Sequence, residues 1–304
     1  NSFFCHCLFY RDIYYFSYII TSTHEDDEAC AAALKDGRIF LFHHLSPLLQ
    51  LWTRNYSSLG SDGSLLKESV LIGCSEQNQA QFCLDVGKNA ALEENFKGNF
   101  IDLRKAFFLL DGPEAPLVSQ ALLRWHQTSR FCSATGQPTQ RNQAGSQRVC
   151  SSSSTIYYPK MSTVAVVLVS DGKRCLLGRQ SSFPRGLYSV LAGFCDMGET
   201  LEEALCREVA EEVGLEIQSI SYSSSQHWPF PHSSFMLGCH ASVSPAHTQV
   251  KLEDARWFTV EEITHALQVK TPPRRGDPPS LWLPPKPALA NRLIREWVER
   301  QDRT

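Results

Sequence analysis

Residues 193–215 read GFCDMGETLEEALCREVAEEVGL, and this stretch decides the fold. It fits one fixed pattern: a glycine, five residues, a glutamate, seven residues, and then Arg-Glu-apolar-x-Glu-Glu-x-Gly-apolar. The positions that fit are Gly193, Glu199, Arg207, Glu208, Val209, Glu211, Glu212, Gly214 and Leu215. At ordinary residue frequencies a chance match is on the order of one in 10⁹ per starting position. The stretch therefore indicates a defined structural unit with a defined chemistry.

The second half of this stretch is expected to be an amphipathic helix. Thr200 and Glu203 have the spacing of a capping box at a helix start. Gly214 suits the left-handed residue that ends a helix. The apolar positions that would form one buried stripe are Leu201, Leu205, Val209 and Val213. Gly193 is expected to let the preceding loop bring its backbone close to a phosphate group.

The glutamates of this helix predict a metal site. Glu208 and Glu212 stand four residues apart on one face, and Glu211 lies beside them. Like charges at this spacing repel, so a cation would turn an unfavourable arrangement into a binding site. Carboxylate oxygens suit Mg²⁺ or Mn²⁺, and Glu211 or Glu212 is the candidate base towards a bound water. The alternative is a solvated acidic helix, which the surrounding glycines and arginine disfavour.

The stretch resembles the signature of the Nudix hydrolases. The resemblance implies an α/β fold: a Nudix α/β/α sandwich with a mixed sheet, preceded by a smaller α/β domain and a degenerate zinc-ribbon linker. It also implies hydrolysis of a nucleoside-linked diphosphate with Mg²⁺ or Mn²⁺. The metal ligands carried over are Glu208, Glu211, Glu212 and the backbone carbonyl of Ala192. The structural positions are Gly193, Glu199, Arg207 and Gly214, with Arg207 expected to pair with Glu199.

A second motif, SQHWPFPHS at residues 225–233, is similar to the array that marks the NADH pyrophosphatase branch of this family. Trp228 and Phe230 are expected to stack on a ring of the substrate, while Gln226 and Ser233 hydrogen-bond to it. The alternative is a rigid loop that packs its aromatic residues into the core. The family usually has proline at the position of His227, which leaves the preference for a nicotinamide redox state open.

Three further positions complete the candidate substrate site. The resemblance places Tyr158 near the bound nucleotide and Ala290 on a C-terminal helix that lines the pocket. Phe194, within the signature, is the third candidate. Tyr158 and Ala290 also fit the simpler interpretation that they belong to the core.

Relatives carry a zinc ribbon built from two Cys-x₂-Cys pairs, and here half of each pair is replaced. Cys132 and Cys150 keep the first positions, whereas Thr135 and Ser153 occupy the second. A structural zinc site needs four strong ligands, so no structural zinc is expected. A Cys132–Cys150 disulfide is an alternative that a reducing compartment disfavours.

A late segment departs from the family pattern. Relatives carry an extra metal-binding glutamate shortly before an Ala-x-Trp sequence, and here Lys251 falls at that spacing. Glu253 is the nearest substitute. Either the register shifts to recruit Glu253, or one metal is held less firmly.

Length and composition set the remaining bounds. With 304 residues, 42% of them hydrophobic, the chain is long enough for more than one globular domain. A net charge of −3 argues against a nucleic-acid partner. The odd count of 11 cysteines favours reduced thiols and an intracellular location. No apolar run reaches the roughly 18 residues of a membrane span, so no membrane association is expected.

The expected organisation is an N-terminal segment, an NADH pyrophosphatase-like domain, a degenerate zinc-ribbon linker and a Nudix domain, at residues 1–25, 26–125, 126–160 and 161–304. In the last domain a strand is expected at Leu187–Leu191 and another at Gln218–Tyr222, and earlier a helix at Phe100–Leu110. The N-terminal segment neither supports nor excludes import. The resemblance implies a mitochondrial location and leaves a homodimer open.

These observations predict an enzyme that hydrolyses the diphosphate bond of NAD(P)H, giving a reduced nicotinamide mononucleotide and AMP or 2′,5′-ADP. The substrate partner is then a small dinucleotide. One alternative is a Nudix hydrolase acting on another nucleoside diphosphate or on NAD-capped RNA. A different class of alternative is a non-catalytic dinucleotide-binding or scaffold protein, which Lys251 and the lost zinc ligands would fit.

Overall fold

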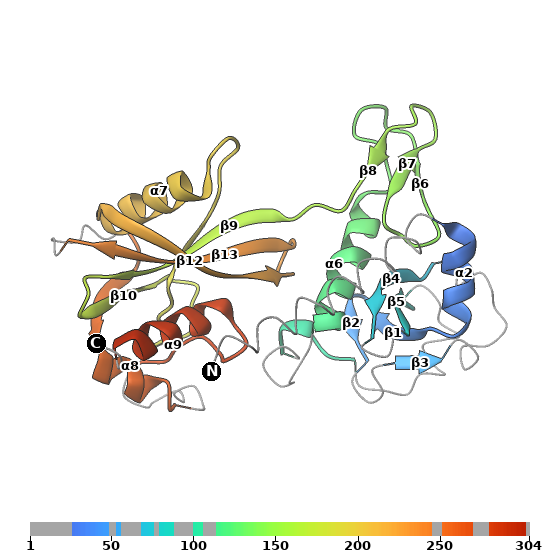
Figure 1. The fold of residues 1–304 in the computed structure, drawn as a ribbon. Coiled ribbons are helices and arrows are strands. Elements are labelled where there is room, and N and C mark those ends of the chain that lie inside the picture. The colour runs from blue at the N-terminus through green and yellow to red at the C-terminus, as the bar shows by residue number, and fades with distance from the viewer. Residues whose placement is uncertain are drawn as a thin grey trace, which may run out of the picture. The chain divides into compact units, whose positions relative to one another are not determined.

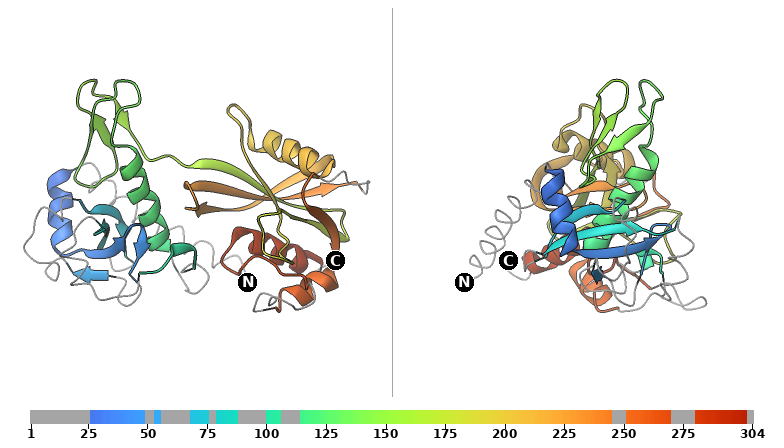
Figure 2. Two further views of the ribbon diagram at one scale, coloured as in Figure 1. Left: turned by 180° about the vertical axis from the view of Figure 1, so that it is seen from behind. Right: turned by 90° about the vertical axis from the view of Figure 1, so that its right-hand side faces the viewer.

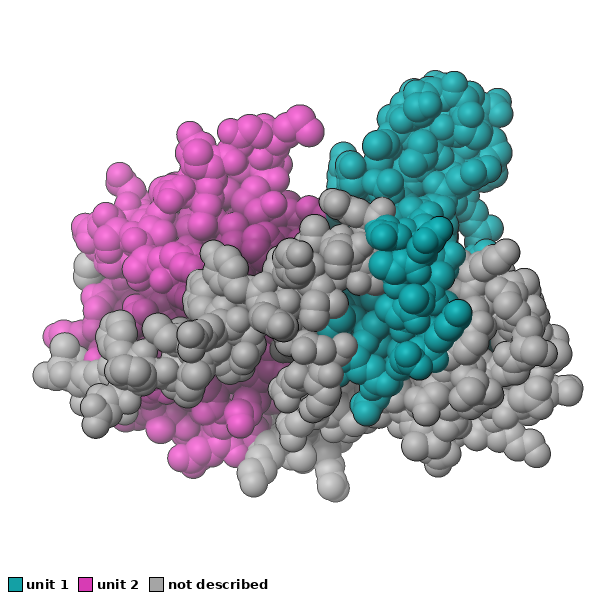
Figure 3. Space-filling view, turned by 45° about the vertical axis from the view of Figure 1, so that its right-hand side comes forward, with its two compact units in different colours: residues 1–160 teal, residues 161–304 magenta. Residues whose placement is uncertain are grey.

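The chain forms two compact units, residues 1–160 and 161–304, and each is described by itself (Figure 3). The computed structural model describes residues 26–48, 53–55, 68–75, 79–87, 100–105, 114–244, 251–269 and 280–301. The predicted N-terminal segment, 1–25, lies outside the described residues. None of the helices within these described ranges is long and apolar enough to cross a membrane.

The first unit contains a five-stranded mixed sheet between two helices (Figure 1). Its elements are α2 (Asp27–Lys35), β1 (Arg38–His43), β2 (Ser46–Pro47), β3 (Thr53–Asn55), β4 (Val70–Cys74), β5 (Ala80–Asp85) and α6 (Glu114–Thr128). The sheet order is β2-β1-β5-β4, with β3 also paired to β1. Alternate residues of β1 face opposite sides: Ile39 packs with Leu34 of α2, and Phe42 packs with Leu123 of α6. Both faces of this sheet are therefore covered.

A three-stranded antiparallel ribbon follows α6. Its strands are β6 (Thr139–Arg141), β7 (Arg148–Cys150) and β8 (Ile156–Tyr157), in the order β6-β7-β8. Arg141 ties the ribbon to the segment just before β4, because its Nη1 donates to the carbonyl of Glu68 at 3.0 Å. We call β6–β8, the turns between them and the Cys132–Gly136 turn that precedes them the ribbon.

The second unit is a three-layer α/β/α sandwich, which confirms the predicted fold class (Figures 1 and 2). Its strands are β9 (Ser162–Ser170), β10 (Arg174–Arg179), β11 (Leu191–Phe194), β12 (Ile217–Trp228), β13 (Ser234–Val243) and β14 (Asp254–Thr259). Its helices are α7 (Leu201–Val213), α8 (Val260–Ala266) and α9 (Leu289–Gln301). The six-stranded sheet runs β12-β13-β9-β10-β14, with β11 also paired to β9. It is mixed because β13 and β9 are parallel whereas the other pairs are antiparallel.

Helix α7 forms where the sequence predicts it, and for the predicted reasons. Both hydrogen bonds of the capping box between Thr200 and Glu203 are present, and Gly214 ends the helix with φ +70°. The buried stripe includes Leu205, Val209 and Val213, which pack on one face of the sheet. Helices α8 and α9 cover the other face. The glutamates of α7 are thereby held beside β11 and the loop that precedes the helix.

Three predicted elements differ from the structure. The predicted strand Leu187–Leu191 is wrong in position, because the strand that pairs with β9 is Leu191–Phe194. Residues 187–190 instead make single bridges to Gly178 and Trp282. Strand β12 continues past Tyr222 to Trp228 and so includes the first half of the second motif. Of the predicted helix Phe100–Leu110, residues 103–105 are helical and residues 106–110 lie outside the described part.

Candidate active site

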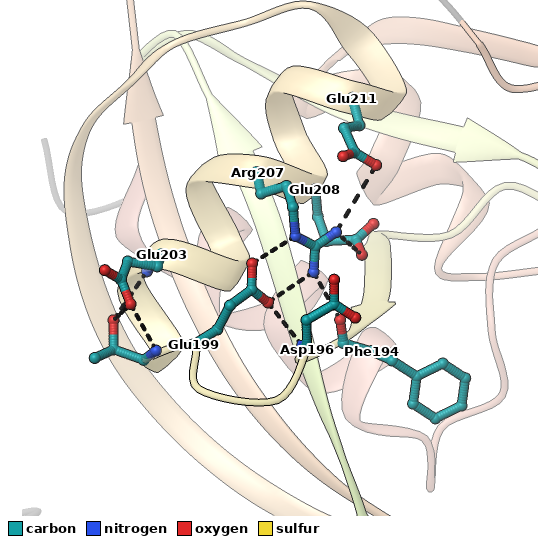
Figure 4. A network of polar contacts seen from close by, with 8 residues as sticks. Phe194, Asp196, Glu199, Glu203, Arg207, Glu208 and Glu211 are labelled. Atoms are coloured by element: carbon teal, nitrogen blue, oxygen red, sulfur yellow. Dashed lines mark hydrogen bonds and ion pairs between the residues drawn. The ribbon is translucent and has the colours of Figure 1, made fainter.

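Arg207 on α7 is the centre of the site and ties the preceding loop to the helix (Figure 4). Its Nε and Nη2 donate to the two carboxylate oxygens of Glu199 at 2.6 and 2.9 Å, which is the expected pair. Nη2 also donates to the carbonyl of Phe194 at 2.8 Å. Nη1 donates to Glu208 Oε1 at 2.8 Å. One planar guanidinium thus fixes strand β11, the loop and a glutamate of the helix.

The charge of this network is fixed as well as its shape. The hydrogen bonds from Arg207 lower the pKa of Glu199 to about 2, and the amide of Asp196 also donates to this carboxylate. Its two carboxylate partners raise the pKa of Arg207 above its already high ordinary value. Glu199 is therefore an anion and Arg207 a cation throughout the working pH range of an enzyme.

Gly193 is required by a close approach of Glu208. A Cβ built on Gly193 would lie 1.8 Å from Cδ of Glu208 and 1.9 Å from its Oε1. The sequence interpretation assigned Gly193 to a close approach of phosphate, whereas in the structure the group against its backbone is a carboxylate. Glu208 is consequently held directly beside the peptide that joins Ala192 to Gly193.

Glu212 is the buried member of the acidic group. Its Oε2 is buried and has no hydrogen-bond partner among the described residues. Burial raises the pKa of Glu212 to about 7, and the carboxylates of Glu208 and Glu211 act in the same direction. A buried carboxylate oxygen without a hydrogen-bond donor lowers the stability of the fold. A bound proton or cation would stabilise this oxygen.

These features fit a divalent cation. The donors are hard carboxylate oxygens, one of them buried without a partner, and Gly193 leaves room for the Glu208 carboxylate against the backbone. Glu211 is more open: its side chain is 52% exposed and lies 3.8 Å from Arg207 Nη1. Glu208 and Glu212 are therefore the inner candidates, with Glu211 at the solvent side.

Glu253, in the segment after β13, is paired with a basic side chain. The Glu253 carboxylate lies 3.4 Å from Nε of Arg179, which is a pairing that sequence reasoning did not predict. The amide of Lys251 donates to the carbonyl of Glu212 at 2.9 Å, which joins this segment to the end of α7.

The second motif forms the end of β12 and the turn that leads into β13. Gln226 uses its amide to hold the start of α9: Nε2 donates to the carbonyl of Pro287 and Oε1 accepts from the amide of Leu289, both at 2.8 Å. His227 Nε2 lies 3.0 Å from Ser233 Oγ and closes the turn. Sequence reasoning assigned Gln226 and Ser233 to the substrate and missed these contacts. Only the folded chain brings Gln226 to a helix more than sixty residues later.

The aromatic candidates differ in exposure. Phe230 is 9% exposed and meets Trp228 edge to face, with ring centroids 5.4 Å apart. Phe230 therefore fits the alternative in which the second motif packs its aromatic residues into the core. Phe194 is 60% exposed beside the Arg207 network, and Ala290 is partly buried against the core under α9. Tyr158 is 57% exposed and belongs to the first unit.

The ribbon keeps the turns of a zinc site with altered side chains. Backbone hydrogen bonds of 2.9 and 3.2 Å close one turn from Cys132 to Gly136 and another from Cys150 to Ser154. Thr135 Oγ1 lies 3.5 Å from Cys150 Sγ, and Tyr157 Oη lies 3.0 Å from Cys132 Sγ. Both cysteines are free thiols. Hydroxyl groups thus occupy the surroundings of both sulfurs.

Comparisons with known proteins agree with this architecture. Family models match in three consecutive parts: the NADH pyrophosphatase-like rudimentary NUDIX domain at residues 36–125, the NADH pyrophosphatase zinc ribbon domain at 127–158 and the NUDIX domain at 159–277. A sandwich with a glutamate-bearing helix bound to its loop by arginine is thus a Nudix domain.

Curated relatives extend the match over most of the chain. NAD(P)H pyrophosphatase NUDT13, mitochondrial, from Homo sapiens is 50% identical over 91% of this chain and 88% of its own length. The Mus musculus protein of the same name is 50% identical over 90% and 88%. NAD-capped RNA hydrolase NUDT12 from Macaca fascicularis is 38% identical over 64% of this chain and 44% of its length. The chain belongs to the Nudix hydrolase family, whose members use divalent metal ions.

Proposed function

We propose that this protein is a mitochondrial NAD(P)H pyrophosphatase, which splits the diphosphate of NADH into reduced nicotinamide mononucleotide and AMP. The observation that carries the reaction is the buried, partnerless carboxylate oxygen of Glu212 beside Glu208 and Gly193. The nicotinamide substrate and the location are supported by two relatives that are 50% identical and are named as mitochondrial NAD(P)H pyrophosphatases.

The metal ligands we propose are Glu208, Glu211, Glu212 and the carbonyl of Ala192. Bound Mg²⁺ or Mn²⁺ would polarise the diphosphate and make a water molecule more acidic. Arg207 keeps Glu208 in place through its 2.8 Å hydrogen bond and keeps the loop closed through Glu199. We propose no zinc in the ribbon, because hydroxyls replace two of its thiolate ligands.

We assign the base to Glu212 rather than to Glu211. The geometry favours Glu212, because its Oε2 is buried and has no hydrogen-bond partner among the described residues, which leaves this oxygen available to accept a proton. Glu211 is half exposed and close to a guanidinium. Glu212 would accept a proton as the water oxygen forms its bond to phosphorus. The bond from that phosphorus to the bridging oxygen breaks, and the bridging oxygen leaves with the other phosphate.

For the substrate we propose Phe194, Gln226, Trp228, Phe230, Ser233 and Ala290 of the second unit, with different roles. Tyr158, in the first unit, is a separate proposal that rests on the family resemblance. Phe194 is the exposed ring nearest the acidic site and is proposed to stack on a base or nicotinamide. Gln226 and Phe230 act by holding α9 and the hairpin in place. The homodimer that the resemblance leaves open is a separate proposal that light scattering would test.

The test compares Glu212→Gln with Glu202→Gln. Glu202 is an exposed glutamate in the first turn of the same helix, so its substitution removes the same charge away from the site. With Mn²⁺ and NADH, the wild type should release AMP, Glu212→Gln should lose at least ~100-fold in kcat, and Glu202→Gln should stay within about 3-fold. Glu212→Gln should melt at or above the wild-type temperature, because the exchange removes a buried group repelled by its neighbours.

Equal AMP release by wild type and Glu212→Gln would refute the role of Glu212. A folded wild type that cleaves no dinucleotide would refute the proposed enzyme and favour a binding protein. The same assay with NADPH, NAD⁺, ADP-ribose and NAD-capped RNA separates the pyrophosphatase from the decapping alternative, whose support is the NUDT12 relative.

A further inference from the structure

The first unit contains a large cavity that the proposed reaction does not use. Its volume is about 1000 Å³, and its walls come from α6, the ends of β4 and β5, and the ribbon strands β6 and β7. This is the upper end of the range for sites that bind small molecules. All of its lining residues lie between positions 44 and 148, within one unit.

Three arginines line this cavity: Arg130, Arg141 and Arg148. The hydrogen bonds of Arg148 go to neutral groups, with Nε donating to Thr139 Oγ1 at 2.7 Å and Nη2 to the Thr139 carbonyl at 2.8 Å. Within the described ranges, neither Arg130 nor Arg148 forms an ion pair. Burial lowers the pKa of Arg148, and the positive charge of Arg130 acts in the same direction. Two like charges thus line the same cavity.

His126 holds Arg148 but adds no charge. Its Nε2 lies 2.8 Å from the carbonyl of Gly145, so this nitrogen carries the hydrogen. Nδ1 must then accept from Arg148 Nη1, at 3.2 Å. Burial lowers the pKa of His126 to about 4, with nearby Arg141 acting in the same direction. The ring is neutral at physiological pH and keeps the guanidinium in a fixed position.

The two acidic residues of the wall do not neutralise this charge locally. Asp85 accepts hydrogen bonds of 3.0 to 3.2 Å from the amides of His44, Leu45 and Gly87 and from the side chain of Gln127. Glu68 is exposed, and its charge raises the pKa of Arg148 less than burial lowers it. With three arginines against two acidic residues, the lining of the cavity carries an excess of positive charge that suits an anion.

An exposed aromatic residue completes the cavity. Phe131 follows Arg130 in the sequence, lines the same cavity and is 66% exposed. Exposed aromatic faces beside arginines suit a base attached to a phosphate. We propose that this cavity binds a mononucleotide, with its 5′-phosphate at Arg130 and Arg148 and its base against Phe131. This site is separate from the glutamates of α7 and does not depend on the proposed reaction.

The test measures AMP binding to the full chain by calorimetry in EDTA, which keeps divalent cations from the glutamate site. Hydrogen exchange with AMP present then locates the ligand. We expect protection of peptides covering residues 123–148 rather than 193–215. Arg130→Gln should weaken AMP binding at least ~10-fold. Phe131→Ala should weaken AMP binding about 10-fold and leave binding of inorganic phosphate within about 2-fold.

Arg38→Gln is the matched control, because Arg38 is an exposed arginine of the same unit that does not line the cavity. It should bind AMP as the wild type does. Equal AMP affinity for Arg130→Gln and wild type, or protection confined to residues 193–215, would overturn the proposal. Equal losses for AMP and phosphate in Phe131→Ala would overturn the placement of the base.

Discussion

The helix α7 and the ribbon, each matched by a model of the same family, differ in how far their side chains keep the family pattern. Both keep their backbone: the capping box and Gly214 bound α7, and paired turns at Cys132 and Cys150 shape the ribbon. The α7 framework also keeps its acidic side chains, whereas the ribbon has hydroxyls at Thr135 and Ser153. The turns of the ribbon are thus present although two of the four cysteine positions carry hydroxyl groups.

Electrostatics separates the two regions further. At α7, burial and the neighbouring glutamates raise the pKa of Glu212. The negative charge of Glu212 is therefore disfavoured, and a bound cation would stabilise it. In the ribbon, hydrogen bonds from Ser152, Ser153 and Thr135 lower the pKa of Cys150 to about 5. Hydrogen bonds from these hydroxyls therefore stabilise the ionised form of Cys150, as a bound metal would. They do not supply the four strong ligands that a structural zinc site needs.

Restoring the missing ligands should produce the largest change. The double substitution Thr135→Cys and Ser153→Cys returns four thiols to the two turns. We expect the zinc affinity to rise at least ~10⁴-fold, because tetrahedral thiolate sites bind zinc strongly. The variant should then hold about one zinc ion per chain. Elemental analysis after dialysis against a weak chelator measures this. Thr135→Cys alone should gain much less; a wild type that already holds one zinc per chain would contradict the comparison.

Gly193→Ala should damage the α7 site next most strongly. The added Cβ would overlap the carboxyl group of Glu208, which must then move away from the backbone. We expect a loss of ~100-fold or more in AMP release from NADH. Gly172→Ala is the control for backbone strain without a clash: its Cβ would meet no atom within 4 Å, and its φ is +93°, so it should lower stability rather than AMP release. Wild-type turnover by Gly193→Ala would show that the position of Glu208 is not needed.

The attachment of the ribbon should be sensitive to acid. The pKa of His126 falls from its ordinary value of 6.5 to about 4 in the fold. Between pH 6.5 and pH 4, His126 is protonated in the unfolded chain but neutral in the folded chain. The free energy of unfolding therefore falls as the pH drops from 6.5 to 4. The free energy of unfolding should fall by about 3 kcal/mol in total. Urea unfolding, followed by a signal from the first unit, measures this fall. His126→Gln should flatten this slope, and an unchanged slope would rule out His126 as its source.

Arg207→Lys should have the smallest effect of the set. An ammonium keeps the charge but cannot bond at once to Glu199, Glu208 and the Phe194 carbonyl. We expect kcat for NADH to fall about 10-fold, with a smaller fall for Arg174→Lys. Arg174 pairs with a carboxylate of its own turn, Asp171, at 2.8 Å. Equal effects of the two substitutions would mean that the geometry of Arg207 is unimportant.

Local patterns predicted the local elements well. The cap, the stripe and the final glycine of α7 lie within a few turns of one another, so short-range rules predict that helix. The strand at Leu187–Leu191 was misplaced because apolar residues there are shared between single bridges and β11. Which of two neighbouring apolar runs pairs with β9 depends on the whole sheet.

The sequence by itself determined the family, the α/β/α class and the helix that carries Glu208, Glu211 and Glu212, because these follow from spacing along one segment. Tertiary structure decided why Gly193 must be glycine, why Glu212 resists ionisation, and that Gln226 holds α9. It also assembled the arginine-lined cavity from strands and a helix far apart in sequence. Burial and contacts between distant segments arise only when the chain is folded, and no local pattern encodes them.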